Sequence, residues 1–436
     1  MNYYYLIGIK GTGMASLACM LKDLGNEVSG SDLEKHFFTE EPLIQRHIPI
    51  YPFDSANIHD GMHVIIGNAF LEDFPEVIAA RSNPTCVCSR YHEFVGGFVK
   101  NYETIAAAGS HGKTTTTGML ASMFTEAGET GWLIGDGEGH VTKDTKYFAL
   151  EADEFRRHFL AYHPAVAIIT NVDLDHVDYF KDDADYRLAY EQFSANVTKG
   201  ILIYGEDKEA RKLNLSTSVP HYWYGLNDDD DLQAVNVDER SDGMSFDVMF
   251  QKKMIGHFEL PFVGHHLLLN ALGCIGAGIL EGMDAAAMEA GLSHFKGVKR
   301  RFAVTEIGEN VYIDDYAHHP TEVSVTIDTA RKRFPGRKLV VIFKPHRASR
   351  VKYFANDFVK ALEKADKIFL CEFTSIDDKQ DGTDINIQYL ADRIPGSVVI
   401  PEDEEGAKIL IRERPAVFLF MSSKDIYGLE SIVEAE

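Results

Sequence analysis

Residues 109–117, Gly-Ser-His-Gly-Lys-Thr-Thr-Thr-Thr, combine glycine, lysine and hydroxyl side chains in one short segment. The segment follows the apolar run at residues 104–108 and precedes a helical pattern, which is where a phosphate-binding loop lies. Its glycines would let backbone N–H groups turn toward phosphate oxygens. Lys113 would reach the terminal phosphates, and the Thr114 hydroxyl could bind Mg²⁺. The residue types and their order therefore predict a nucleoside triphosphate site.

The triplet Gly-Lys-Thr alone is a weak signal, because it occurs by chance in many sequences. The standard pattern also has a glycine where this sequence has Ala107. The placement between a predicted strand and a predicted helix favours nucleotide binding over chance occurrence.

Carboxylates close the next predicted strand, at residues 147–150, and are followed by the segment Glu151-Ala152-Asp153-Glu154. A Mg²⁺ ion that bridges nucleotide phosphates needs such an oxygen ligand beside the phosphate loop. Glu151 is our preferred ligand over Asp153 and Glu154, although any of the three could be a solvated loop charge.

A histidine beside two aspartates follows the strand predicted at residues 166–170. The segment is Asn171-Val172-Asp173-Leu174-Asp175-His176. His176 could bind or orient a second metal ion. Taken alone, a histidine near carboxylates is more often a hydrogen-bonded loop residue, so this alternative stays open.

A third cluster lies at residues 314–320, Asp-Asp-Tyr-Ala-His-His-Pro, with Arg300 and Arg301 before it and Arg347 and Arg350 after it. Arginines spaced i, i+3 suit bidentate capture of a carboxylate or a phosphate. The alternative is a surface helix with basic residues. Because the clusters fall at successive strand ends, together they favour a phosphoryl-transfer site.

The elements that must position these residues divide into three alternating segments, which we assign to domains at residues 1–99, 100–297 and 298–436. The first opens with a strand at residues 3–9, a turn at Gly11 and Gly13, a helix, and then Ser31-Asp32. These are the parts of a dinucleotide-binding fold, but the glycine spacing differs from G-x-G-x-x-G. The glycines could instead serve close strand–helix packing; in either case a diphosphate could bind at the helix N-terminus.

The second segment alternates strands and helices and predicts a parallel sheet covered on both faces. Between about residues 221 and 264 the pattern changes to short strands, which predicts an added antiparallel sheet. A helix at about residues 266–283 is apolar nearly all round and should be buried. The third segment begins with a hairpin at residues 304–314 and continues as another α/β unit.

Composition excludes several functions. The formal net charge of −24 over 436 residues argues against nucleic-acid binding, which requires a basic face. The longest apolar run, at residues 267–280, contains Asn270 and is shorter than the roughly 20 residues that a bilayer requires, so we expect no membrane span. Five scattered cysteines indicate buried thiols in a reducing compartment, so we expect a cytoplasmic protein.

Together these segments resemble the Mur ligase family. The resemblance rests on residues 8–14 (Gly-Ile-Lys-Gly-Thr-Gly-Met), the 109–116 loop, Glu151-Ala152, and residues 171–176, 297–302 and 314–320. It runs from Tyr5 to about Ile426. It implies an α/β protein of three domains: a Rossmann-like N-terminal domain for a UDP-sugar, a central phosphate-loop ATPase domain, and a Rossmann-like C-terminal domain for an amino acid.

The resemblance implies an ATP-dependent amide ligase of peptidoglycan synthesis, acting on UDP-N-acetylmuramate and L-alanine as a monomer or homodimer. It assigns to UDP contact the residues Gly11, Thr12, Gly13, Met14, Ser31 and Asp32. It assigns to ATP the residues Gly109, Ser110, His111, Gly112, Lys113, Thr114, Thr115, Asn270 and Arg301. Thr114 and Glu151 would bind one Mg²⁺ and His176 a second. Asp315 would meet the phosphates with Arg301, and L-alanine would lie among His318, Arg347 and Arg350.

The sequence departs from the family pattern at Leu267, where a second adenine-contacting Asn is expected, at Lys344, and at residues 422–424. These departures keep a nucleotide-binding scaffold without turnover as an alternative. A related ligase that recycles a peptide or adds glutamate to a folate is another. A nicotinamide-dependent oxidoreductase would explain only the first glycine turn.

Overall fold

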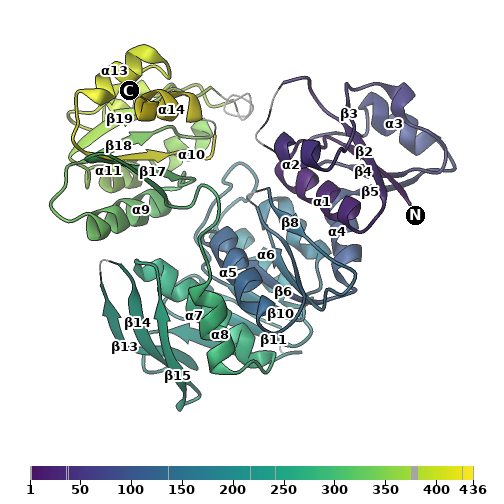
Figure 1. The fold of residues 1–436 in the computed structure, drawn as a ribbon, viewed down its shortest axis with the longest axis horizontal. Coiled ribbons are helices and arrows are strands. Elements are labelled where there is room, and N and C mark those ends of the chain that lie inside the picture. Colours follow the sequence, from purple (N-terminus) through teal and green to yellow (C-terminus); the bar gives the residue numbers. More distant parts are fainter. Residues whose placement is uncertain are drawn as a thin grey trace.

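The computed structural model describes residues 2–435 apart from residues 36, 38, 136, 217, 241, 375–381 and 425. It contains three sheets, and each lies within one of the three predicted segments. In Figure 1 the first and last sheets lie on opposite sides of the upper half, above the central sheet. The chain therefore forms three α/β bodies around a shared centre.

The first sheet has the order β3-β2-β1-β4-β5, and all its strands are parallel. Its strands are β1 (Tyr3–Ile7), β2 (Glu27–Ser31), β3 (Ile50–Tyr51), β4 (His63–Ile66) and β5 (Val87–Arg90), and its helices are α1 (Thr12–Asp23), α2 (Glu40–Gln45), α3 (Pro75–Ser82) and α4 (Tyr91–Val99), with a 3-10 turn η1 (Ser55–Asn57). Strand order reverses on either side of β1, and ligands of such sheets bind outside the carboxyl ends at that point. The predicted glycine turn lies there.

The central sheet has ten strands in the order β15-β14-β13-β12-β11-β10-β6-β9-β7-β8. They are β6 (Glu103–Ala108), β7 (Thr130–Leu133), β8 (Gly139–His140), β9 (Tyr147–Glu151), β10 (Val166–Ile169), β11 (Gly200–Tyr204), β12 (His221–Gly225), β13 (Leu232–Glu239), β14 (Met244–Phe250) and β15 (Lys253–Leu260). The antiparallel strands β13 to β15 are present as predicted, but they continue the main sheet through β12 rather than standing apart. This pairing covers the edge that β12 would otherwise expose.

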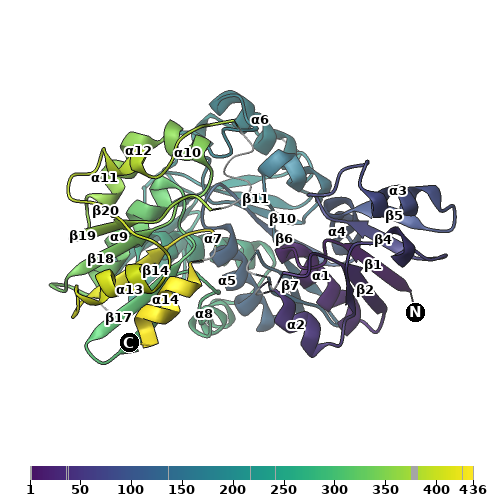
Figure 2. The ribbon, with the colours of Figure 1, turned by 90° about the horizontal axis from the view of Figure 1, so that it is seen from above.

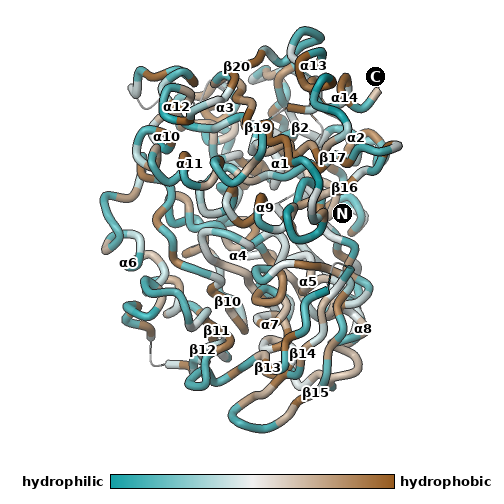
Figure 3. Tube along the Cα trace, turned by 90° about the vertical axis from the view of Figure 1, so that its left-hand side faces the viewer, coloured by the Kyte–Doolittle hydropathy of each residue, from teal (hydrophilic) through white to brown (hydrophobic). Residues whose placement is uncertain are grey.

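Alternate side chains of β6 enter two different cores, as expected for a strand buried on both faces. Ile105 and Ala107 pack against α5 (Lys113–Thr125), α7 (His265–Leu280) and α8 (Ala285–Ser293). Ala106 and Ala108 pack toward α6 (Asp183–Ser194) and toward the first sheet. The helix α7 is buried as its sequence predicted. Figure 3 shows hydrophobic colour along β10 and β11 and hydrophilic colour around α6.

The first body is joined to the central one by a continuous apolar core. Figure 2 shows α1 beside β7, and a Cβ at Gly139, in β8, would lie 2.8 Å from the sulfur of Met20. No sequence pattern predicted β8, which pairs antiparallel with β7. The two short strands therefore form the surface on which α1 rests.

The third sheet has the order β16-β17-β21-β18-β19-β20. Its strands are β16 (Ala303–Ile307), β17 (Asn310–Asp315), β18 (Leu339–Phe343), β19 (Lys367–Leu370), β20 (Val398–Val399) and β21 (Val417–Met421), and its helices are α9 (Pro320–Arg333), α10 (Ala348–Tyr353), α11 (Ala355–Leu362), α12 (Gln388–Ala391), α13 (Glu404–Ile411) and α14 (Tyr427–Ala435). β16 and β17 form the predicted hairpin, and the other pairs are parallel. The end of β17 and the start of α9 face the central body.

No helix within the described residues is both long and apolar enough to cross a membrane. The five cysteines all lie in the described part of the chain and form no disulfide. Cys86 and Cys88 are only partly buried, whereas the other three are buried as predicted.

Candidate active site

The segment 109–112 forms the predicted loop between β6 and α5. Gly109 has φ +135° and Gly112, the residue preceding α5, has φ +82°. A Cβ at Gly109 would lie 2.0 Å from Oγ1 of Thr170, and one at Gly112 would lie 2.9 Å from Oδ1 of Asn270. Among the described residues no side chain caps α5, so backbone N–H groups of its first turn are left for an anion.

Lys113 lies over this loop and is only 12% exposed. Its Nζ donates to the carbonyl of Gly109 at 2.6 Å and pairs with Oε2 of Glu154 at 2.8 Å. Burial disfavours the charged form of Lys113, but Glu154 and its acidic neighbours outweigh burial and raise the pKa of Lys113. Burial raises the pKa of Glu154 to about 7, although Lys113 opposes that shift. Lys113 is therefore positively charged, and a bound phosphate could draw its ammonium group away from the carbonyl of Gly109.

Thr114 and Glu151 meet beside the loop, as predicted. The hydroxyl of Thr114 donates to Oε1 of Glu151 at 3.1 Å, and Glu151 Oε2 accepts the N–H of Gly135 at 2.7 Å. Arg301, from the segment leading into the third sheet, donates from Nη2 to the same hydroxyl at 3.3 Å. A hydroxyl and a carboxylate oxygen are the ligand types that Mg²⁺ prefers.

His176 belongs to a second group, which contains Asp153 and Glu154 rather than Glu151. Ligand atoms of these three residues all lie within 4.8 Å of one another. Burial lowers the pKa of His176 to about 4, so its ring is neutral and can bind a cation. Its buried Nδ1 has no hydrogen-bond partner among the described residues. Two neighbouring positions therefore offer metal ligands, one at Thr114 and one at His176.

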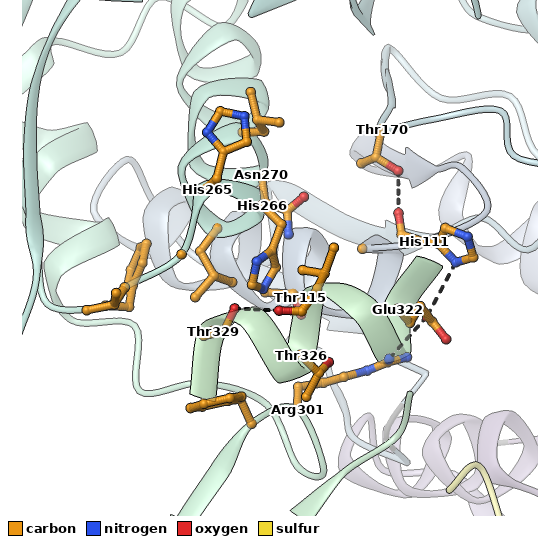
Figure 4. A pocket seen from close by; sticks show the side chains of 18 of the residues that line it. His111, Thr115, Thr170, His265, His266, Asn270, Arg301, Glu322, Thr326 and Thr329 are labelled. Atoms are coloured by element: carbon orange, nitrogen blue, oxygen red, sulfur yellow. Dashed lines mark hydrogen bonds and ion pairs between the residues drawn. The ribbon is translucent and has the colours of Figure 1, made fainter. Parts of the chain in front are cut away.

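A cavity of about 1440 Å³ lies between the central and C-terminal bodies. Figure 4 shows Asn270 and His266 of α7 on one side of it, and Thr326 and Thr329 of α9 on the other. Leu267, where the sequence departs from the family pattern, also lines it. The volume exceeds the roughly 300–1,000 Å³ of most small-molecule sites, so a nucleoside triphosphate fits.

Asp315 lies at the end of β17 and is 6% exposed. Its carboxylate accepts the N–H groups of Phe302 and Ala317, each at 2.8 Å. Burial raises the pKa of Asp315 to about 6. It therefore fixes the segment that carries Arg301, and both residues line the cavity.

The arginines predicted to surround an amino acid are already paired with carboxylates of the central body. Arg350 is 3% exposed, and its Nη2 lies 2.8 Å from Oδ1 of Asp175. Nη1 of Arg347 pairs with Asp178. Nδ1 of His318 lies 3.0 Å from the carbonyl of Tyr316 and 3.2 Å from Oε2 of Glu322. An incoming carboxylate at this position must share or exchange these partners.

The first glycine turn presents a second open helix start. α1 follows Gly11, and no described side chain caps it. Thr12, Gly13 and Met14 form its first turn, and Asp32 binds the N–H of Lys10 at 2.8 Å. The hydroxyl of Ser31 is fully buried and donates to Glu76, so it does not face this turn. The turn can bind a diphosphate through its backbone.

Models of the Mur ligase family match nearly the whole chain. The model described as "Mur ligase family, catalytic domain" matches residues 3–103, "Mur ligase middle domain" matches residues 107–278, and "Mur ligase, glutamate ligase domain" matches residues 300–421. A UDP-N-acetylmuramate–L-alanine ligase of Lactiplantibacillus plantarum is 43% identical over 99% of this chain and 98% of that protein. The chain belongs to the Mur ligase family.

Solved Mur ligase structures share this fold. A UDP-N-acetylmuramate-alanine ligase from Thermotoga maritima is 27% identical, with a TM-score of 0.80 over 100% of this chain and 99% of that chain. A murein peptide ligase from Psychrobacter arcticus is 24% identical, with a TM-score of 0.74 over 100% and 98%. The predicted three-domain Mur ligase architecture, with its small antiparallel component, is thereby confirmed.

Two residues of this Mur ligase site, Glu322 and Asp178, were not predicted from the sequence, and Asp175 was predicted only as a neighbour of His176 and not as the partner of an arginine. The capping role of Glu322 could have been predicted from the sequence. A glutamate three residues after the residue that precedes a helix, here His319, is the spacing of a capping box. Asp175 and Asp178 carried no such signal. Their arginine partners lie far away in the sequence, and only the packing of two domains brings them together.

Proposed function

We propose that this Mur ligase uses ATP to join L-alanine to the lactyl carboxylate of UDP-N-acetylmuramate, a step of peptidoglycan synthesis. The observation that carries the proposal is the uncapped start of α5 with Lys113 above it and Thr114 and Glu151 beside it. The adjoining residues His111, Gly112 and Thr115 line the cavity between the central and C-terminal bodies. The similarity to the Lactiplantibacillus plantarum ligase over nearly the full length supports the same pair of substrates.

The proposed chemistry needs an activated acid, because a carboxylate has oxide as its leaving group. An oxygen of the lactyl carboxylate attacks the γ-phosphorus of ATP, the bond from that phosphorus to the β–γ bridging oxygen breaks, and ADP leaves. The amine of L-alanine, after losing a proton from its ammonium form, then attacks the carbonyl carbon of the acyl phosphate. The C–O bond breaks and inorganic phosphate departs. Lys113 offsets the repulsion between the anions in the first step.

The protein's ligands fit a divalent cation at two positions. We propose that Thr114 and Glu151 hold one Mg²⁺ and that His176 holds a second, since its unpartnered buried Nδ1 and neutral ring suit a metal. Such ions supply charge neutralisation at the phosphates when bound. Asn270 and the loop residues Ser110, His111 and Thr115 complete the proposed ATP site, with Arg301 and Asp315 facing them across the cleft.

We propose three domains with boundaries near residues 99/100 and 297/298. Each would hold one substrate: the UDP-sugar at the α1 start, ATP in the central domain, and L-alanine near His318, Arg347 and Arg350. The ion pairs of Arg347 and Arg350, of which that of Arg350 is buried, support a role in anion recognition, because each guanidinium already binds a carboxylate. Holding three substrates in line lowers a barrier by up to about 7–11 kcal/mol.

The test is a coupled phosphate-release assay with ATP, Mg²⁺ and UDP-N-acetylmuramate. We expect release to require L-alanine, with glycine and L-serine as poorer substrates, and mass spectrometry to find the alanyl product. A peptide substrate that outperforms L-alanine would identify a peptide-recycling ligase instead. Absence of release with every acceptor would contradict the proposal and favour a binding protein without turnover.

A further inference from the structure

Glu322 is the third residue of α9, and its side chain is 11% exposed. The two oxygens of its carboxylate make different contacts. Oε2 accepts the N–H groups of His318 and His319 at 3.1 and 3.2 Å, which caps the helix, and it also lies 3.2 Å from Nδ1 of His318. Oε1 faces the other way, 3.4 Å from Nδ1 of His111 and 3.6 Å from Nη1 of Arg301. Figure 4 shows these two contacts side by side. One residue of the C-terminal domain therefore contacts both the helix start and the phosphate loop.

His111 connects that carboxylate to the loop itself. Its ring lies between Glu322 on one side and Asp173 on the other, with Nε2 3.1 Å from Oδ2 of Asp173. Its backbone N–H is also fixed, donating to Oδ1 of Asn171 at 2.9 Å. The orientation of the residue directly before Gly112 thus depends on a group from another domain.

Arg301 provides a second connection. The same guanidinium that pairs with Glu322 donates to Oγ1 of Thr114, the second residue of α5. Glu322 therefore reaches the loop at two points, through His111 at one end and through Arg301 at the other. Both connections exist only where α9 lies against the central domain.

A capping role alone does not account for this arrangement. A glutamine caps a helix start as a glutamate does. Capping uses Oε2, and burying a carboxylate is unfavourable unless cations surround it. The cations that surround Oε1 are His111 and Arg301, which both belong to the proposed ATP site.

We propose that Glu322 is a positioning residue that couples docking of the C-terminal domain to the shape of the phosphate loop, by orienting His111 and Arg301 toward ATP. This inference rests on the proposed ATP-dependent ligation. On this proposal, bound ATP is oriented for reaction only when α9 lies against the central domain.

The test compares Glu322→Gln with Glu93→Gln. Glu93 caps α4 in the same way, accepting the N–H of Arg90 at 3.1 Å, but it lies in the N-terminal domain and is exposed. Both variants keep their caps, so we expect both to fold. Glu322→Gln also removes a buried charge from beside His111 and Arg301, so we expect its melting temperature to be the lower of the two. We expect kcat/KM for ATP to fall at least about tenfold in Glu322→Gln alone, while KM for UDP-N-acetylmuramate stays within about twofold of wild type.

A double-mutant cycle with His111→Gln gives a second measurement. If Glu322 acts through His111, kcat/KM for ATP falls in the double variant by a smaller factor than the product of the factors for the two single variants. Equal kcat/KM values for Glu322→Gln and Glu93→Gln would overturn the inference, and so would fully multiplicative losses in the cycle. A wild-type protein without turnover would instead contradict the proposed function.

Discussion

Two units of this protein, at residues 8–13 and 109–113, share a strand, a glycine turn and an uncapped helix start, but their surroundings differ. At the first, Lys10 turns away and donates to the carbonyls of Leu33 and Lys35 at 2.6 and 2.9 Å. At the second, Lys113 lies over the loop, where Glu151, Asp153 and Glu154 act on its charge. The backbone cradle is alike, and Lys10 also pairs with a carboxylate, that of Glu40 at 2.8 Å. Among the described residues, however, groups that could hold a metal ion lie only beside the second unit, as at Asp153, Glu154 and His176.

The difference between the two units shows what a site needs to activate a phosphoryl group, beyond what it needs to bind an anion. An open helix start holds an anion in either case. Activating a phosphoryl group also needs a mobile cation, metal ligands and a domain that closes over them. Of the two units, only the second has, among the described residues, ion pairs with the C-terminal domain beside it, where Glu322 pairs with His111 and Arg350 with Asp175. Each prediction below alters one unit and asks whether the other is affected.

The largest effect is expected for Lys113→Ala, which removes the cation over the phosphate loop. We expect turnover to fall by at least about 100-fold to 1,000-fold. Lys10→Ala is the matched change in the first unit and should cost about 1–3 kcal/mol of unfolding free energy while keeping kcat within about twofold. Phosphate-release kinetics and urea unfolding measure both. Comparable losses of kcat would remove the distinction between the two units.

Arg350→Ala tests the domain contact. Because it leaves Asp175 buried without its cation, we expect the unfolding free energy to fall by about 3–5 kcal/mol. Adding Asp175→Asn should recover part of this loss, while KM for L-alanine stays raised more than KM for ATP. Thermal melts and initial rates provide the measurement. An equal rise in the two KM values would count against the amino-acid position.

Gly11→Ala tests the first unit. The backbone accepts a Cβ there, since the nearest atom, the carbonyl oxygen of Gly8, is 3.4 Å away. The methyl group would stand at the open helix start, so we expect KM for UDP-N-acetylmuramate to rise about tenfold, with KM for ATP unchanged. Gly97→Ala, in α4, is the control, because a Cβ added there would have no neighbouring atom within 4 Å. Unchanged KM values would place the diphosphate elsewhere.

The last prediction is a pH dependence of stability. Burial disfavours the imidazolium of His111, but Asp173 and Glu322 outweigh it and raise the pKa to about 10, from an ordinary value of 6.5. The third neighbour is the His319 ring, with its centroid 4.6 Å away. The stabilisation is fully present below pH 6.5 and is lost as the pH rises through about 10. The difference in unfolding free energy between wild type and His111→Gln should follow that course, and a difference that grows with pH would contradict it.

Much of the fold was predictable because its signals are local. The strand preceding Gly109, the mostly apolar α7 and the hairpin of the third sheet were each predictable from neighbouring residues. The continuation of the central sheet into β13 was not predictable, because periodicity reports strands but not which edge they join.

The site shows the same division. The pairing of Thr114 with Glu151 was predictable, because Thr114 follows the phosphate loop at the start of α5 and Glu151 ends a strand beside it. The grouping of Glu154 with His176 did not, because spacing along the chain does not say which of three neighbouring carboxylates faces which ligand. Pairs across domains, such as Arg350 with Asp175, depend on packing between residues that are far apart in sequence.

The central claim is that the triphosphate held at residues 109–117 converts the lactyl carboxylate into an acyl phosphate. The most direct measurement uses UDP-N-acetylmuramate labelled with ¹⁸O in that carboxylate, with ATP, Mg²⁺ and L-alanine. Because the amine displaces phosphate from carbon, the account predicts that one carboxylate oxygen appears in the released inorganic phosphate. Phosphate that forms together with the alanyl product but contains no ¹⁸O would contradict it.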